Sequence, residues 1–176
     1  MRYARSLVGL ALVWAVVGCA SGPSENFKNQ VSAELADLKK AQDQVASLKA
    51  DVGQIQSPLD SLKQALGKVW SDKVEKDKDL APQLKEVGEE VQKLTNDLNS
   101  VEGQLGSAIT EAESFANGLA QQTKGDQELK PEWDNLKNKV NQAAGQLAGL
   151  TERATQLKQR VSSLTEAIQK KYSAKK

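Results

Sequence analysis

The chain has 176 residues, of which 27% are charged and only 4% are aromatic, and its formal net charge is +1. Histidine is absent and there is a single cysteine, which excludes Ser-His and Cys-His catalytic pairs, the usual zinc and copper ligand sets and an internal disulfide. The near-zero charge gives no reason to expect nucleic-acid binding. No cofactor, metal or small-molecule substrate is expected.

Residues 1–18 have the pattern of a secretory signal peptide. Arg2 and Arg5 make the start of this segment positive, and the eleven residues from Leu7 to Val17 are apolar apart from Gly9. A helix of that length rises roughly 16 Å, whereas a membrane span needs about 20 residues. The segment is therefore too short to be a stable transmembrane helix.

The apolar run ends in Val16-Val17-Gly18-Cys19. This sequence resembles the lipobox of bacterial lipoproteins, with an aliphatic residue three positions before the cysteine and a small residue directly before it. The resemblance covers residues 1–19 and implies cleavage before Cys19, a diacylglycerol on its sulfur and usually an acyl chain on the new amino group. Ala20, rather than aspartate, implies the outer membrane by the same resemblance. The alternative interpretation is a free cysteine buried in a core helix.

Residues 19–26 are predicted to be a flexible tether that begins at the lipidated cysteine. The sequence Ser21-Gly22-Pro23-Ser24 is small, polar and interrupted by glycine and proline, a composition typical of linkers. Ser24 has the side chain that caps helix N-termini. The first helix is expected to follow and to span about residues 27–71.

Apolar residues recur at steps of three and four through this first helix. Gln42 is expected to occupy one core position, and the step from Val45 to Leu48 departs from a strict heptad. Pro58, preceded by serine, has the signature of a helix start, although the apolar spacing continues across it. A kink or a very short break is therefore predicted near residues 55–57.

Two further helices are predicted, over about residues 82–122 and 128–172. The charge-dense segment 72–82 ends in proline and is the expected first turn. The second turn is Thr123-Lys124-Gly125-Asp126, in which the glycine ends one helix and the aspartate caps the next. Pro131 is expected in the first turn of the third helix. The apolar stripe of the third helix consists of Leu129, Trp133, Leu136, Val140, Ala143, Leu147, Leu150, Ala154, Leu157, Val161, Leu164 and Ile168.

Three helical segments joined by short turns predict an all-α fold: an elongated antiparallel three-helix bundle, or coiled coil, over residues 27–173. The apolar stripes are narrow, close to two positions in seven, which favours coiled-coil packing. The alternative is a chain that opens its hairpins and buries the stripes in an oligomer. Four glycines in the second helix either permit close helix approach or soften that helix, namely Gly88, Gly103, Gly106 and Gly118.

Two tryptophans are candidate partner contacts. Trp133 falls on the apolar stripe and Trp70 lies beside it, so core packing near a bundle end is the favoured interpretation of both, and contact with a protein partner is the other. The acidic residues alternate with lysines on the outer faces, which predicts solvated surfaces with weak pairs within each helix. No phosphate-binding loop, nucleophile elbow or isolated carboxylate pair is present, so the protein is not predicted to be an enzyme.

Residues 169–176 end in a basic tail, 173–176, whose last residue is Lys176. This stretch loosely resembles the end of the murein lipoprotein of enteric bacteria, a lipidated heptad-rich helix whose terminal lysine is joined to peptidoglycan. The resemblance implies wall attachment through Lys176. That lipoprotein is a single short helix that trimerises, whereas this chain is longer and interrupted. The alternative is a solubilising end that complements the helix dipole.

These features predict a non-enzymatic, lipid-anchored protein of the outer membrane that faces the periplasm and spaces or scaffolds envelope components. One alternative is a helical binding module for an envelope, secretion or motility protein, which an uncovered apolar stripe would favour. Another is a lipoprotein linked to peptidoglycan through Lys176. In each case the partners are the membrane, through Cys19, and an unidentified protein or the wall.

Overall fold

The computed structural model describes residues 22–172 of the chain. Within this range the chain is helical and contains no strand. Two short helical turns connect the longer helices, a π-helical turn at Trp70–Val74 and a 3-10 turn at Leu119–Gln121. The four α-helices are α1 (Glu25–Gly53), α2 (Ser57–Leu66), α3 (Leu80–Gly118) and α4 (Asp126–Tyr172).

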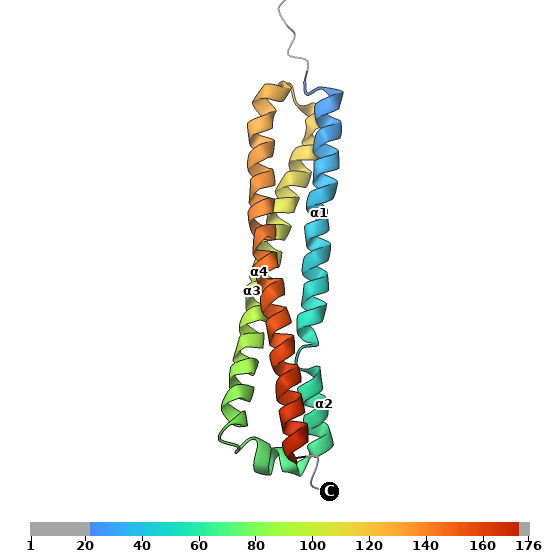
Figure 1. Cartoon of the computed structure of the whole chain (residues 1–176). Helices are drawn as coiled ribbons and strands as arrows, with labels where there is room; N and C mark the ends of the chain where they lie inside the picture. The colour runs from blue at the N-terminus through green and yellow to red at the C-terminus, as the bar shows by residue number, and fades with distance from the viewer. Residues whose placement is uncertain (1–21, 173–176) are drawn as a thin grey trace, which may run out of the picture.

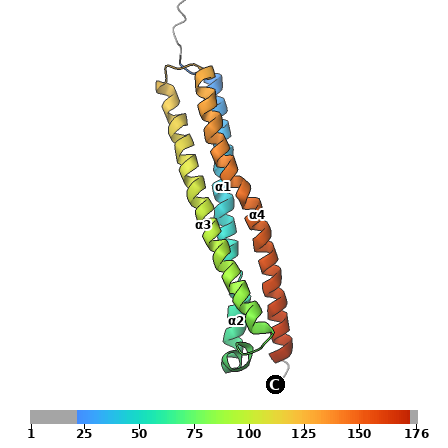
Figure 2. The ribbon, with the colours of Figure 1, turned by 90° about the vertical axis from the view of Figure 1, so that its left-hand side faces the viewer.

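The helices form a long, thin bundle with three arms (Figures 1 and 2). The first arm is α1 followed in line by α2, α3 runs back along it, and α4 returns in the direction of α1. We call the end that holds Gly22–Glu25 and the α3–α4 turn the near pole. The far pole is the end that holds the α2–α3 connection and Tyr172. The predicted all-α helical bundle is confirmed, and the first predicted segment proves to be two helices.

The first arm is interrupted at the predicted place. Helix α1 ends at Gly53 and α2 begins at Ser57, with Pro58 in its first turn, where the missing N–H leaves no bond unmade. Ile55, in the short turn between them, is 2% exposed, and its backbone N–H donates to the Val52 carbonyl at 3.1 Å. The buried face therefore continues through the break, which makes α1 and α2 one arm.

The connection at the far pole begins earlier than predicted. Gly67 ends α2 with φ of 50°, a left-handed value that favours glycine, and its N–H donates to the Lys63 carbonyl at 3.0 Å. The chain then forms the π-helical turn before α3 starts at Leu80. The prediction of a continuous helix to residue 71 was wrong because the periodicity of apolar residues does not reveal the backbone conformation of a glycine.

The apolar stripe of α4 is buried at every predicted position. In α3 the stripe is also buried, although Leu84, Val91 and Phe115 are only partly covered, and Ile109 is an additional buried residue. The arm formed by α1 and α2 covers the remaining side of both stripes. A single chain thus buries its own apolar seam, without the opened hairpins of the oligomeric alternative.

One predicted core position in α1 was wrong. Ala41 is buried, at 8% exposure, whereas Gln42 is exposed. With Ala41 in the seam, the residues from Leu38 through Val45 to Leu48 follow a regular alternation of steps of three and four. The departure from the heptad therefore lies before Ala41. An amide in the seam would lose its hydration without a partner, whereas a small apolar side chain loses nothing.

Ion pairs between arms define the register of α3 against α4. Lys139 pairs with Glu111 at 2.7 Å, Arg153 with Asp97 at 2.6 Å, and Arg160 with Glu90 at 2.6 Å. Along α4 the three basic residues are spaced by two heptads and then by one. Along α3 their acidic partners have the same spacing but follow in the opposite chain direction. This is the antiparallel equivalent of the charged flanks of a coiled coil. The prediction that the charges pair mainly within a helix was therefore incomplete.

The glycines of α3 soften the helix rather than admit a neighbour. A Cβ atom built on Gly103, Gly106 or Gly118 meets no atom within 4 Å, and one built on Gly88 has only an ordinary contact with the Gln56 side chain. Of the two alternatives, close helix approach is therefore wrong at Gly103, Gly106 and Gly118, and intrinsic weakening of the helix explains these positions.

Replacement of Gly103 or Gly106 by alanine is expected to raise the free energy of unfolding by about 0.5–1 kcal/mol each. Alanine restricts the unfolded chain and meets no obstacle in the folded one. Urea denaturation followed by circular dichroism measures the change. The matched control is Gly67→Ala, which should lower stability because φ is positive there. A loss of stability in both α3 variants would show that these glycines have a packing role.

Candidate functional site

Two of the predicted site residues, Cys19 and Lys176, lie outside the described residues. The other two, Trp70 and Trp133, are described and both are buried, at 6% and 1% exposure. Their positions correspond to the core packing that the sequence favours. Contact of either tryptophan with a partner remains a prediction, and their burial gives it no support.

Trp133 is the centre of a polar and aromatic contact near the near pole. Its ring stacks on Phe115 of α3, with centroids 5.7 Å apart and planes inclined by 20°. Its Nε1–H donates to Glu34 Oε2 of α1 at 2.6 Å, and Lys137 Nζ donates to the same oxygen at 3.0 Å. Trp133 thereby joins all three arms at one level.

The carboxylate of Glu34 has an unusually low pKa. Gln30 Nε2 donates to its other oxygen at 2.9 Å. This bond and the Trp133 N–H, followed by the Lys137 ammonium, lower the pKa of Glu34 from 4.5 to about 2, although burial acts in the opposite direction. Lys137 correspondingly has a raised pKa, chiefly through its hydrogen bond to Glu34. The side chain of Glu34 is 28% exposed, so it forms a half-buried ion pair with Lys137.

At the far pole, Trp70 begins the π-helical turn and fills the end of the core. The ammonium of Lys63 lies 6.0 Å from the centre of its ring, at the outer limit of a cation–π contact. Val74, at the other end of this turn, is fully buried. The turn thus closes the bundle with side chains of its own.

The charge-dense segment at the far pole contains one buried carboxylate, Asp77. Its side chain is only 4% exposed and accepts hydrogen bonds from Lys171 Nζ at 2.5 Å and from the Tyr172 hydroxyl. Its other oxygen accepts from the backbone N–H of Asp79 at 3.0 Å and of Leu80 at 3.3 Å, where α3 begins. Asp77 therefore ties the last turn of α4 to the first turn of α3.

These bonds change the titration of all three side chains. The Lys171 ammonium, followed by the Tyr172 hydroxyl and the backbone N–H groups, holds the pKa of Asp77 well below its usual range. In return, the pKa of Lys171 and that of Tyr172 are raised, mainly by their hydrogen bonds to Asp77. All three groups keep their usual charge state at neutral pH.

Replacement of Asp77 by alanine is expected to loosen the far pole selectively. Amide exchange in the first turn of α3 and the last turn of α4 should accelerate by roughly tenfold, because Leu80 N–H and Tyr172 hydroxyl both lose a partner. Hydrogen–deuterium exchange with mass spectrometry measures this. Asp72→Ala, at an exposed position of the same connection, is the matched control. Equal exchange in both variants would contradict the role of Asp77.

The near pole has a corresponding contact between Ser24 and Asp126. Ser24 is the N-cap of α1, as predicted, and its Oγ accepts from the Phe27 N–H at 3.1 Å. The same Oγ donates to Asp126 Oδ2 at 2.6 Å, and the Ser24 backbone N–H donates to Asp126 Oδ1 at 2.7 Å. These two bonds lower the pKa of Asp126, the hydroxyl having the larger effect.

Three details of this end differ from the predictions. Helix α1 begins at Glu25, so the predicted tether 19–26 overlaps the helix. Asp126 accepts from Ser24 rather than capping its own helix, which already begins at that residue. As a result, Pro131 lies inside α4, beyond its first turn, where one hydrogen bond of the helix cannot form.

Sequence reasoning missed Glu34, Asp77 and Asp126 as connecting residues. Glu34 stands beside the seam residue Leu35, and a carboxylate that flanks the stripe is a weak signal for an interhelical partner. Asp77 is one of several acids in its segment, and nothing local distinguishes it. Their partners are 94 to 103 residues away along the chain.

The described residues 22–172 contain no group of three or more side chains arranged to hold a metal ion, and none of their helices is long and apolar enough to cross a membrane. The hollows between α3 and α4 are open grooves lined mainly by polar or small side chains. Another hollow lies at the near pole, where the starts of α1 and α4 meet, and acidic side chains are among those that line it. No protein family, curated protein or solved structure matches this chain. The residues of the chain itself therefore carry the inference of function.

Proposed function

We propose that the protein is a lipid-anchored, non-enzymatic rod, held at the outer membrane through Cys19, that faces the periplasm and spaces or scaffolds envelope components. The observation that carries this proposal is the position of the lipobox-like sequence Val16-Val17-Gly18-Cys19, directly before a rod whose chain enters at one pole. Several acyl chains hold a protein on a membrane far more firmly than one.

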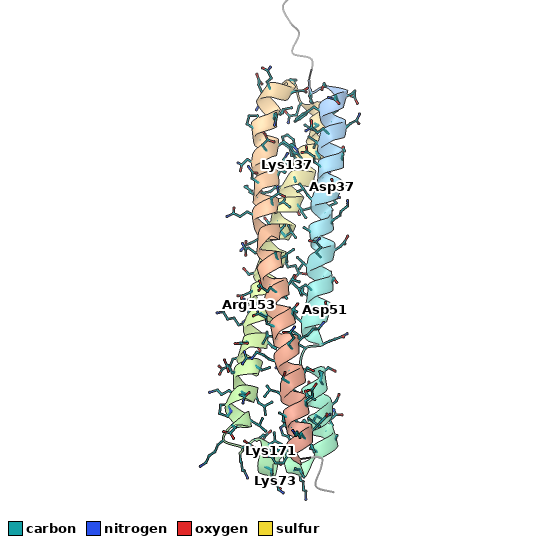
Figure 3. All side chains as sticks on the ribbon, viewed as in Figure 1. Asp37, Asp51, Lys73, Lys137, Arg153 and Lys171 are labelled. Carbon is teal, nitrogen blue, oxygen red and sulfur yellow. The ribbon has the colours of Figure 1, made fainter. Side chains whose placement is uncertain are left out.

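The geometry of the bundle supports a spacer. Helix α4 has 47 residues and is roughly 70 Å long at 1.5 Å per residue. Gly22 contacts Gln122 at the near pole, and Tyr172 bonds Asp77 at the far pole. The start of α1 and the end of α4 lie at opposite ends of the bundle (Figure 1), and Lys73 and Lys171 both lie at the far pole (Figure 3). A lipid on Cys19 would thus hold one end and leave the other about 70 Å away.

The coverage of the apolar stripe bears on the choice between a spacer and a binding module. A module that captures a helix would present an apolar groove. In the described residues the seam is occupied by the chain's own arms, and the grooves on the surface between α3 and α4 are lined mainly by polar or small side chains. This favours the spacer over binding through an open apolar stripe.

The test of the proposal is Cys19→Ser, expressed in a diderm bacterium and fractionated. The wild-type protein is expected in the outer-membrane fraction with an acyl mass on Cys19, and the variant in the soluble or unprocessed pool. The helical signal in circular dichroism checks that the domain is folded in both. An equal membrane pool for the two proteins would refute the anchor.

Attachment to peptidoglycan through Lys176 is a second candidate. The observation that favours it is Asp77, which holds Lys171 and Tyr172 at the far pole, so that residues 173–176 follow from the end opposite Cys19. Muramidase digestion and mass spectrometry should then find muropeptide on Lys176 and lose it in Lys176→Arg. Lys175→Arg is the matched control. Wild-type protein without muropeptide would refute this candidate while leaving the anchor unaffected.

A further inference from the structure

The chain enters the bundle through a contact at the near pole that we call the N-terminal clamp, formed by Gly22, Pro23, Ser24 and Asp126. Pro23 is buried, and Ser24 makes its two hydrogen bonds to Asp126. Gly22 lies so close to the α3–α4 turn that a Cβ atom on it would come 2.2 Å from the carbonyl oxygen of Gln122. From Gly22 onward, the chain is therefore attached to this turn.

The clamp limits the distance between the bundle and the residue proposed to carry lipid. Only three residue steps separate Cys19 from Gly22. A fully extended chain covers at most about 3.6 Å per residue, which gives about 11 Å for these steps. A tether over the whole of residues 19–26 would allow more than twice this reach. Gly22, which contacts the α3–α4 turn, must therefore stay within about 11 Å of the Cys19 backbone.

The surface of the near pole suits the headgroup layer of a phospholipid membrane. Gln121, Gln122, Thr123 and Lys124 are all exposed there and offer amide, hydroxyl and ammonium groups to phosphate and glycerol oxygens. The acids Glu25 and Glu128 are exposed at the same end, so the pole is polar and of mixed charge. The long sides of the rod instead carry lysine and arginine residues that are paired with carboxylates of neighbouring helices, such as Lys49 with Glu102 at 2.7 Å. The short tether thus directs this pole to the lipid, and its polar groups are compatible with the hydrated headgroup layer.

We propose that the near pole is a membrane-docking surface, with the α3–α4 turn against the phospholipid headgroups and the N-terminal clamp as the device that keeps it there. This inference rests on the proposed lipidation of Cys19 and goes further, because lipidation alone is also compatible with a rod on a loose tether. The clamp makes the attachment a property of the folded bundle. The far pole is then the end presented to the wall or to a partner.

The experiment uses the processed, lipidated full chain in vesicles of phosphatidylethanolamine and phosphatidylglycerol. A benzophenone amino acid replaces Thr123 at the near pole or Lys73 at the far pole, and lipid adducts are quantified after illumination. Thr123 is expected to give several-fold more adduct than Lys73. A flexible insertion of ten residues between Ala20 and Ser21, which leaves the clamp untouched, should reduce the Thr123 adduct several-fold.

Gly22→Ala tests the clamp itself and is expected to reduce the Thr123 adduct, whereas Gly103→Ala, where a Cβ has free space, should leave it unchanged. Docking would be overturned if Thr123 gave no more lipid adduct than Lys73, or if the insertion left the Thr123 adduct unchanged. Either result would count against docking even if the protein is bound to the vesicles. Flotation and the intact mass report the anchor separately: a chain without acyl mass on Cys19 would overturn the proposed function and this inference with it.

Discussion

Replacement of Trp133 by alanine is expected to lower the free energy of unfolding by about 3–5 kcal/mol, the largest effect of any substitution considered for this chain. The side chain is 1% exposed and fills the core between the three arms. Its loss would leave a cavity against Phe115 and remove the N–H that reaches Glu34. Urea denaturation followed by circular dichroism measures the change.

Trp133→Phe is the control that separates packing from hydrogen bonding. Phenylalanine keeps a ring against Phe115 but has no N–H for Glu34, whose carboxylate retains Gln30 and Lys137. A loss of about 1–2 kcal/mol is expected, well short of the alanine variant. If both variants lost the same free energy of unfolding, the ring packing would contribute little. If Trp133→Ala lost less than about 1 kcal/mol, the central place of Trp133 in the core would be contradicted.

The second large effect is the dependence of stability on pH through Glu34. Its folded pKa of about 2 lies below the ordinary value of 4.5, so the carboxylate stabilises the fold above pH 4.5 and this contribution disappears as the pH falls toward 2. The full shift would correspond to roughly 3 kcal/mol. Because the side chain is 28% exposed, solvent screening reduces our expectation to about 1–2 kcal/mol.

The free energy of unfolding of wild type and of Glu34→Gln is measured at pH 7 and at pH 2. Taking the difference between the two proteins at each pH removes the contribution of the other carboxylates. The difference should be about 1–2 kcal/mol at pH 7 and close to zero at pH 2. Glu102→Gln, in an exposed pair with Lys49, is the matched control and should show a difference below about 0.5 kcal/mol at both values. A constant difference for Glu34→Gln would contradict the role of its charge.

The helices and their buried faces were predictable because both depend on residues close in the chain. Every apolar residue assigned to the stripe of α4 is buried, and Ser24 caps α1 as its residue type indicates. The break at Pro58 also lies where predicted. The predictions were wrong where either of two neighbouring residues could fill a core position, as with Ala41 and Gln42. They were also wrong where the end of a helix depended on a backbone angle, as at Gly67.

The contacts that hold the arms together were not predictable in this way. Asp77 is one of three aspartates between residues 72 and 79 with similar sequence surroundings, yet it alone meets Tyr172. Likewise, nothing near Ser24 indicates Asp126, 102 residues away. Such pairs arise only when the antiparallel register of the arms is set, since a side chain finds its partner by position in space.

The sequence by itself determined that the chain is helical, which faces are buried and where the lipobox-like Cys19 lies, because these are patterns of neighbouring residues. Only the tertiary structure decided that Asp77 closes the far pole and that Gly22, Pro23 and Ser24 are held against the α3–α4 turn. Residues 22–24 have the composition of a flexible linker, yet they are ordered in the clamp. Their hydrogen bonds to Asp126 and their packing against the α3–α4 turn outweigh the conformational entropy that a short linker loses.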